Sequence, residues 1–157
     1  MASLPIKELL DAVVTELQGA TTTHLNDSSI KVYKGDQAAW RYRKGIFVVW
    51  AGGSQEPASI QGQWDDIHDI WVIVRQEAKD STGAVADGAW YDDFLELCEE
   101  VILEVGLVAN RNLTGAGGST THKTELIDWN PGYDSEGTTE MLVCQLILRI
   151  WGPRDDP

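Results

Sequence analysis

The sequence predicts an α+β domain, in which a mainly antiparallel sheet of about five strands packs against two helices. Two observations lead to this prediction. A run of strand-forming residues is followed by the strongest amphipathic helix of the chain, which is a helix-on-sheet packing unit. Near the C-terminus, two strand-like runs are joined by a turn, as in an antiparallel hairpin. The predicted element order is α-β-β-β-α-β-β, with both helices on one face of the sheet.

The N-terminal part is predicted to hold one helix and two strands. Ser3–Leu17 is expected to be helical, because Pro5 suits a first turn and apolar residues recur at spacings of three and four. Ile30–Tyr33 is a short run of strand formers. Ile46–Ala51 is continuously apolar, which favours a strand that is buried on both faces. The polar, glycine-containing run Gly52–Asp66 is expected to be a loop.

The central strand–helix unit follows. Ile70–Val74 is rich in β-branched residues and bounded by polar ones, so it is expected to be a strand. Lys79–Gly88 has the composition of a loop. The helix after it is predicted from apolar residues that share one face: Phe94, Leu97, Cys98, Val101, Ile102 and Val105. Gly106 is expected to end this helix.

The C-terminal part is predicted to be a hairpin. Lys123–Trp129 and Thr138–Trp151 are the strands, and Asn130–Gly132 begins the turn between them. Both faces of the longer strand are at least partly apolar, which predicts a cover on each face of the sheet, by helices or by another subunit. Residues 1–151 are expected to form a single domain, and residues 152–157 a frayed tail.

Charge and composition narrow the classes of function. The 157 residues carry a net charge of −13, which opposes adhesion to nucleic acid or to an anionic membrane. No apolar run approaches the roughly 20 residues of a membrane span, and we expect no signal peptide in MASLPIKELL, which lacks a basic segment before an apolar one. Cys98 and Cys144 lie on predicted apolar faces and are expected to be buried free thiols.

The charges are unevenly distributed along the chain. Residues 1–86 hold 8 basic and 11 acidic residues, a balance of −3, and residues 87–157 hold 4 and 14, a balance of −10. Seven acids and no Lys or Arg lie between Asp87 and Glu104, around the second helix. A basic strip surrounds the first two strands: Lys31, Lys34, Arg41, Arg43 and Lys44. Two interpretations stay open for each cluster, a solvated face or a surface that docks a partner of opposite charge.

No motif of catalysis is present. The one cluster with ligands that suit a divalent ion is Asp65, Asp66, His68 and Asp69. Asp66 and His68 are expected on one side of a strand and the other two on the opposite side, so this pair is a weak metal candidate. An exposed polar strand entry is the simpler interpretation. His24 and His122 lie in polar segments without a partner motif. We therefore expect neither an enzyme nor a bound cofactor.

Three stretches carry a resemblance to a known family. They are the helix LPIKELLDAVVTEL, the strand IFVVWA and the unit HDIWVIVRQEAKDSTGAVADGAWYDDFLELCEEVILEV, in which a His leads an alternating strand into a polar loop and a helix. A late hairpin closes the pattern. This order of elements, over most of the chain and without a diagnostic motif, resembles the tail terminator (tail completion) proteins of long-tailed bacteriophages.

The resemblance implies a subunit of a ring, commonly a hexamer, that caps the tail tube and binds the head–tail connector protein. It implies a virion protein of the tail and neck, assembled in the host cytoplasm, with DNA passing through the ring without specific binding. A strongly negative subunit suits such a channel. The family has no catalytic residues to carry over, and the Trp content and the run Asn110–Thr121 do not match it.

Opposite charge clusters on one subunit favour head-to-tail contacts, which close into rings. The resulting hypothesis pairs Arg41, Arg43 and Lys44 of one subunit with Asp92, Asp93, Glu96 and Glu100 of the next. Exposed ion pairs contribute little each, so Trp40 and Trp90 are expected to carry most of the affinity. Three alternatives stay open: another neck subunit, such as a head-completion or connector protein; a small metal-dependent enzyme built on Asp66 and His68; and an adaptor outside any virus.

Overall fold

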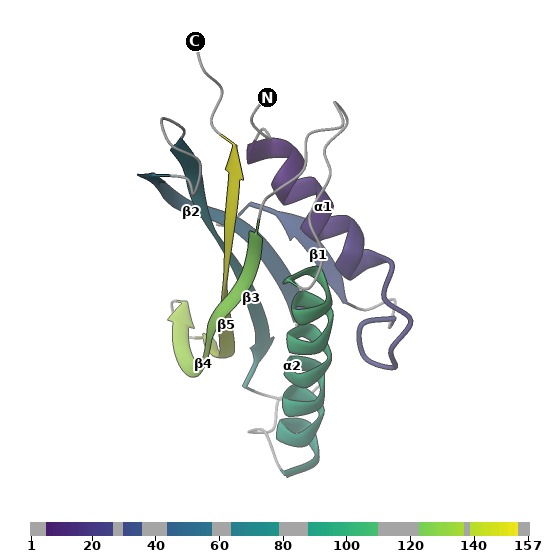
Figure 1. Ribbon diagram of the computed structural model, residues 1–157. Helices are drawn as coiled ribbons and strands as arrows, with labels where there is room; N and C mark the ends of the chain where they lie inside the picture. Colours follow the sequence, from purple (N-terminus) through teal and green to yellow (C-terminus); the bar gives the residue numbers. More distant parts are fainter. Residues whose placement is uncertain are drawn as a thin grey trace.

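Among the residues that it describes, the computed structural model has two helices and five strands, and it confirms the predicted α+β class and element order (Figure 1). It describes residues 6–26, 30–35, 44–57, 64–78, 88–109, 123–136 and 139–153. The helices are α1 (Ile6–Gln18) and α2 (Gly88–Ala109). The strands are β1 (Lys31–Lys34), β2 (Lys44–Pro57), β3 (Trp64–Glu77), β4 (Lys123–Glu136) and β5 (Thr139–Pro153).

All five strands form one sheet in the order β1-β2-β3-β5-β4. β1 pairs with β2 in parallel, and the other neighbours are antiparallel, including the predicted β4–β5 hairpin. The short β1 and the long β4 are therefore the two edges of the sheet.

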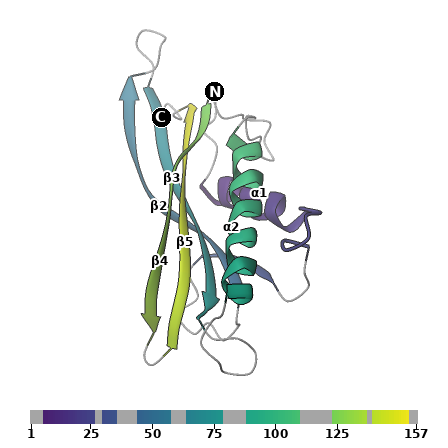
Figure 2. The same cartoon turned by 90° about the horizontal axis from the view of Figure 1, so that it is seen from below.

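Both helices pack on one face of the sheet, as predicted (Figure 2). Alternate residues of the three central strands point toward the helices, for example Val48, Val72 and Leu146, each with 0% exposure. They meet Val13 of α1 and Val101 of α2 in one core. Burial of each such side chain contributes roughly 1.5–3 kcal/mol, so this face of the sheet stabilises the fold.

The predicted loop at Gly52–Asp66 is wrong at both ends. β2 continues to Pro57 and β3 begins at Trp64, with residues 52–57 paired to residues 64–69. The strand continues through Gly52 because this glycine has a φ of +116° and lies where the register shifts, after Trp50. Such a bulge lets the ladder continue beyond a residue that would otherwise end it.

Two further predicted stops are wrong. α2 runs through Gly106, whose φ is not positive, to Ala109. Asn130–Gly132 lies inside β4, where Pro131 pairs with Cys144. Pro131 is tolerated because β4 is an edge strand and needs no donor on its outer side. β5 likewise includes Gly152 and Pro153, the first two residues of the predicted tail.

The second face of the sheet carries no helix within the described residues (Figure 2). On it lie Val49, Trp71 and Ile147, which are neighbours across three strands. Trp71 is 38% exposed, and the other two are half-buried. No described helix provides the second cover that the sequence predicts, although Phe47, on the same face as Val49, is 0% exposed. Cover by another subunit stays a prediction.

Candidate interaction surface

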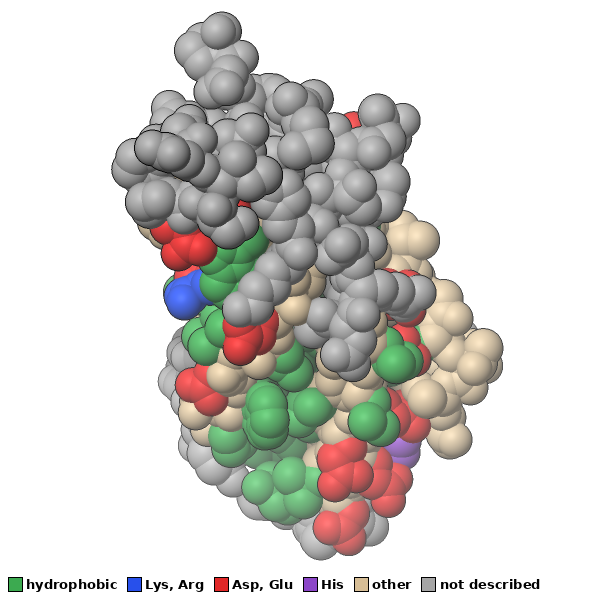
Figure 3. Space-filling view, viewed as in Figure 1, with side chains coloured by type: hydrophobic (Ala, Val, Ile, Leu, Met, Phe, Trp, Pro, Cys, Tyr) green, Lys and Arg blue, Asp and Glu red, His purple; other side chains and the backbone are tan. Residues whose placement is uncertain are grey.

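The outer side of α2 is the largest concentration of acidic and exposed apolar residues among the described parts of the chain. Its stripe of buried residues, such as Phe94 and Val101, faces the sheet, so the remaining positions face outward. We call this side the α2 outer surface. Its exposed side chains are Tyr91, Asp92, Asp93, Leu95, Glu96, Glu99, Leu103 and Leu107. Figure 3 shows acidic and apolar side chains next to each other on this face of the molecule.

The apolar part of this surface was not predicted from the sequence. Leu103 is 66% exposed and Leu107 is 53% exposed, and Trp129 of the neighbouring edge strand β4 is similarly exposed, at 50%. Large apolar side chains exposed together, and rimmed by polar ones, are typical of protein–protein contact sites. A spacing of four residues, as between Leu103 and Leu107, is the signal that indicates a second apolar stripe on the helix.

Two of the predicted interface acids make contacts within the chain. Glu100 Oε2 accepts hydrogen bonds from the backbone N–H groups of His24 and Leu25, at 2.8 and 2.9 Å. Glu96 Oε2 lies 2.7 Å from His24 Nε2. The sequence shows no partner motif for His24, yet the structure gives this residue two partners on α2. These partners are more than 70 residues apart, and no local pattern in the sequence indicates such a contact.

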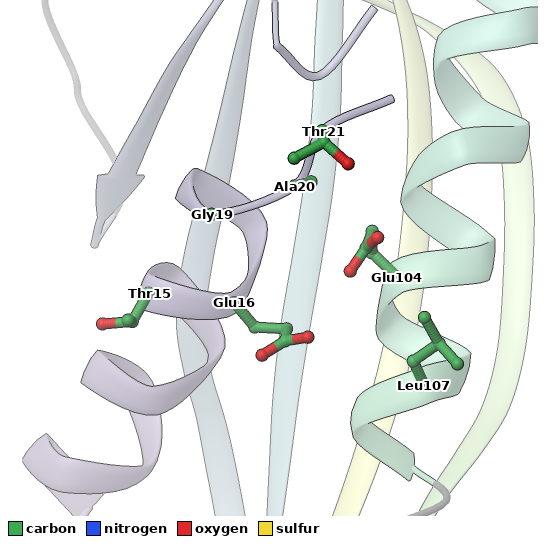
Figure 4. Close-up of a pocket in the computed structure, with 7 residues that line it drawn as sticks. All are labelled: Thr15, Glu16, Gly19, Ala20, Thr21, Glu104 and Leu107. Atoms are coloured by element: carbon green, nitrogen blue, oxygen red, sulfur yellow. The ribbon is translucent and has the colours of Figure 1, made fainter. Parts of the chain in front are cut away.

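A hollow of about 580 Å³ continues the acidic surface toward α1. Glu16 of α1 and Glu104 of α2 point into it from facing helices (Figure 4). Its other lining residues are Thr15, Gly19, Ala20, Thr21 and Leu107. Two carboxylates above an apolar side chain favour a cationic group with an aliphatic stem, such as a lysine or an arginine of a partner.

The weak metal candidates Asp66 and His68 lie on the same face of β3, as predicted, but no third ligand joins them within the described residues. Trp50 Nε1 donates to His68 Nδ1 at 3.3 Å, and Gln55 Nε2 donates to Asp66 Oδ1 at 3.3 Å. Burial lowers the pKa of His68, while Asp66 and Asp69 act in the opposite direction. The arrangement is that of a histidine packed beside a tryptophan.

Asp69 lies on the opposite face of the strand, where Arg149 of β5 is its cross-strand neighbour. Arg149 Nε and Nη2 donate to the two carboxylate oxygens of Asp69 at 2.8 and 3.1 Å. These hydrogen bonds raise the pKa of Arg149. A bidentate pair is geometrically specific, so it orders the centre of the sheet face that no described helix covers.

The described tryptophans are exposed to an unusual degree. Of the seven in the sequence, Trp50, Trp71, Trp129 and Trp151 have described side chains, and none of the four is buried. Tryptophan is enriched in protein interfaces because a large rigid ring buries much area at little cost in entropy. These four side chains lie on both faces of the sheet and on its edge, so they point to more than one contact surface.

The other half of the predicted charge pairing is only partly described. Trp40, Arg41 and Arg43 lie outside the described residues, as do the side chains of Lys44 and Trp90. Two members of the basic strip remain, Lys31 and Lys34, and both are exposed on the edge strand β1. Lys34 Nζ lies 2.9 Å from Asp11 of α1, so that lysine already has a partner within the chain.

The two-layer arrangement, with helices on one face of a five-stranded sheet, defines the chain as an α+β fold. Among solved structures it is similar to a chain in the virion of a native gene transfer agent particle, with a TM-score of 0.54 over 94% of this chain and 96% of that chain. The two sequences are 13% identical, so the similarity shows the fold. No protein-family model and no curated protein matches the sequence. None of the described helices has the length and apolar character of a membrane span.

Proposed function

We propose that this chain is a structural protein of a virion, of bacteriophage or phage-like type. The observation that carries the proposal is the similarity to a virion chain over nearly the whole length of both chains. The match covers 94% of this chain and 96% of that chain, so it concerns the whole fold rather than one motif. The absence of any recognisable catalytic motif in the sequence agrees with a structural role.

Within that class, we propose a ring-forming tail terminator. Its ring, expected to be a hexamer, caps the tail tube, contacts the connector at the head, and lets DNA pass without specific binding. The protein is assembled in the host cytoplasm and ends in the tail or neck of the virion. Support comes from two unlike surfaces on one subunit, the α2 outer surface and the sheet face that no described helix covers, because unlike surfaces favour head-to-tail contacts that close into rings.

The interface hypothesis keeps its acidic residues and its two tryptophans, and we add the exposed leucines of α2 to its apolar part. Asp92 and Asp93 are exposed and free to face Arg41, Arg43 and Lys44 of a neighbour, whereas Glu96 and Glu100 also hold the segment at His24. Ion pairs at a rim govern orientation and association rate more than affinity. The affinity is assigned to the apolar side chains, Trp40 and Trp90 with the exposed leucines of α2.

The experiment is the native mass in solution, measured by light scattering over a range of concentrations, with imaging of any large species. A closed ring of uniform subunit number supports the proposal. The double substitution Arg41→Glu and Arg43→Glu should then shift the ring toward monomer, while Lys7→Glu, on the 78% exposed side chain of a lysine outside the basic strip, should not. A ring that is unchanged in the double variant refutes the charge pairing.

The same structural similarity supports one alternative within the class, another neck subunit such as a head-completion or connector protein. The two differ in what they bind. A terminator should bind the end of purified tail tubes and stop their growth, and a head-completion protein should bind connector-bearing heads instead. Co-sedimentation with each of the two partners distinguishes them.

A further inference from the structure

We propose that His24, Asp93 and Glu96 form a binding site for a divalent transition-metal ion such as Zn²⁺, which clamps the segment after α1 onto α2. Each residue offers one ligand atom, and these three atoms all lie within 4.8 Å of one another. The site is separate from the weak candidates Asp66 and His68, and it does not depend on the proposed function.

The ligands come from two separate parts of the chain, so an ion would link those parts. Asp93 and Glu96 are three positions apart on α2, which places their carboxylates side by side on one face of the helix. His24 lies between α1 and β1, far away in sequence. One imidazole and two carboxylates form a mixed nitrogen and oxygen set, which suits Zn²⁺ better than Mg²⁺ or Ca²⁺, since the latter prefer oxygen ligands alone.

His24 is held in place before any ion binds. Glu100, one turn beyond Glu96, accepts the backbone N–H groups of His24 and Leu25. The Leu25 side chain is buried in the core at 7% exposure. The backbone at His24 is therefore held against the helix and the imidazole contacts Glu96, so less conformational entropy remains to be lost on binding. Supporting hydrogen bonds of this kind are typical of metal sites.

The distances require a small adjustment that the side chains permit. Around a tetrahedral ion with bonds of roughly 2.0–2.2 Å, neighbouring ligand atoms lie about 3.4 Å apart. His24 Nε2 and Glu96 Oε2 are 2.7 Å apart and would move outward, which is easy because the Glu96 side chain is 61% exposed. The carboxylate of Asp93, which is also exposed, would move inward, toward the ligand atoms of His24 and Glu96.

Electrostatics favour a cation here. The 22 residues of α2 hold six acids and no Lys or Arg, and like charges on adjacent turns repel. His24 lies outside the helix and contacts two of these acids, Glu96 through its imidazole and Glu100 through its backbone N–H. A divalent ion would offset the repulsion further.

The test is titration of the full-length, chelator-treated protein with ZnCl₂ by calorimetry, with thermal unfolding in parallel. His24→Gln and Asp93→Asn each remove one ligand. Asp92→Asn is the matched control, because it removes the same charge from the neighbouring position. Asp93 is exposed, so its replacement should leave the fold intact if His24→Gln does not.

The expected result is one ion per chain in the wild type and in Asp92→Asn, with affinity at least tenfold lower in His24→Gln and Asp93→Asn. Zn²⁺ should raise the unfolding temperature of the first two proteins only. The proposal is overturned if Zn²⁺ does not bind to the wild type. It is also overturned if the two ligand variants bind Zn²⁺ as tightly as Asp92→Asn, since that result indicates general attraction to the acidic surface.

Discussion

Glu100 offers the sharpest test of how the α2 outer surface is used. Replacing Glu100 with Ala removes the oxygen that accepts two backbone N–H groups, at 2.8 Å from His24 and 2.9 Å from Leu25. Hydrogen bonds to a charged acceptor contribute roughly 1.5–3 kcal/mol each. The two share one carboxylate oxygen, so their contributions are less than additive. Water can reach the partly buried site, and we therefore expect a loss of about 2–3 kcal/mol in the free energy of unfolding.

Glu99→Ala is the matched control. It makes the same change at the adjacent, exposed helical position, so the effects of helix propensity and net charge cancel in the comparison. A surface substitution of this kind should change stability by about 0.5 kcal/mol or less. Glu100→Gln should fall between the two, because a neutral amide oxygen still accepts hydrogen bonds but more weakly.

The assay is urea unfolding followed by circular dichroism, at a protein concentration at which all variants have the same native mass. Hydrogen exchange at the amides of His24 and Leu25 should become faster in Glu100→Ala and not in Glu99→Ala. If the two variants have equal unfolding free energies, Glu100 is not a tether of the segment after α1. It would then be available for the contact between subunits, and the reasoning given for the intramolecular role would be refuted.

Three other predictions follow from single residues. Gly52→Ala should lower the free energy of unfolding by about 1–2 kcal/mol, because φ at this bulge is +116°. Gly106→Ala, in open space within α2, should raise the free energy of unfolding by up to about 1 kcal/mol in the same urea assay. Equal effects of the two substitutions would contradict both backbone assignments. Burial lowers the pKa of His68 from its usual 6.5, so the unfolded chain takes up the proton first, and the free energy of unfolding should fall as the pH drops below about 6.5. His68→Gln should flatten that part of the pH profile. A profile that is the same in His68→Gln and in the wild type would contradict this assignment. The thiol contact with Cys144 and burial raise the pKa of Cys98, so a thiol reagent should label the native protein slowly and the urea-unfolded protein quickly; rapid labelling of the native state would show that Cys98 is accessible.

The periodic parts of the fold could be predicted from the sequence. The stripe from Phe94 to Val105 repeats at the helical period, and the alternation along Thr139–Pro153 has the period of a strand, so each indicates which side is buried. The free, buried state of Cys98 and Cys144 follows from the same patterns, and the structure confirms it. These signals are local, because each pattern lies entirely within one helix or one strand.

The ends of the elements could not be predicted in this way. Gly52, Gly106 and Pro131 are local signals for a stop, yet β2, α2 and β4 all continue through them. At two of these places a neighbouring strand determines the outcome: β3 pairs with the residues after Gly52, and β5 pairs with β4 on both sides of Pro131. Tertiary context of this kind overrides a residue preference of about 1 kcal/mol.

The same distinction applies to the candidate surface. The acidic side of α2 could be predicted, because Asp92, Asp93, Glu96 and Glu100 recur within one helix. The contact of Glu96 and Glu100 with His24 could not, because it depends on how the segment after α1 returns to the helix. A sequence shows that carboxylates share a face, but it does not show which of them already have a partner.

That difference changes what the acidic surface can do in an assembly. Glu96 and Glu100 are occupied by groups of their own chain, so a neighbouring subunit that paired with them would first have to displace His24 or compete with it. Asp92 carries no such cost, and neither does Asp93 in the metal-free chain; both lie at the N-terminal end of α2. Contacts through the C-terminal end would instead rely on Leu103 and Leu107, which are more than half exposed.

A basic partner should therefore bind across the surface in one orientation, with its charges at the start of α2 and its apolar residues at the end. A helix with evenly distributed free carboxylates would not favour either direction, and a fixed direction is what a closed ring of identical subunits requires.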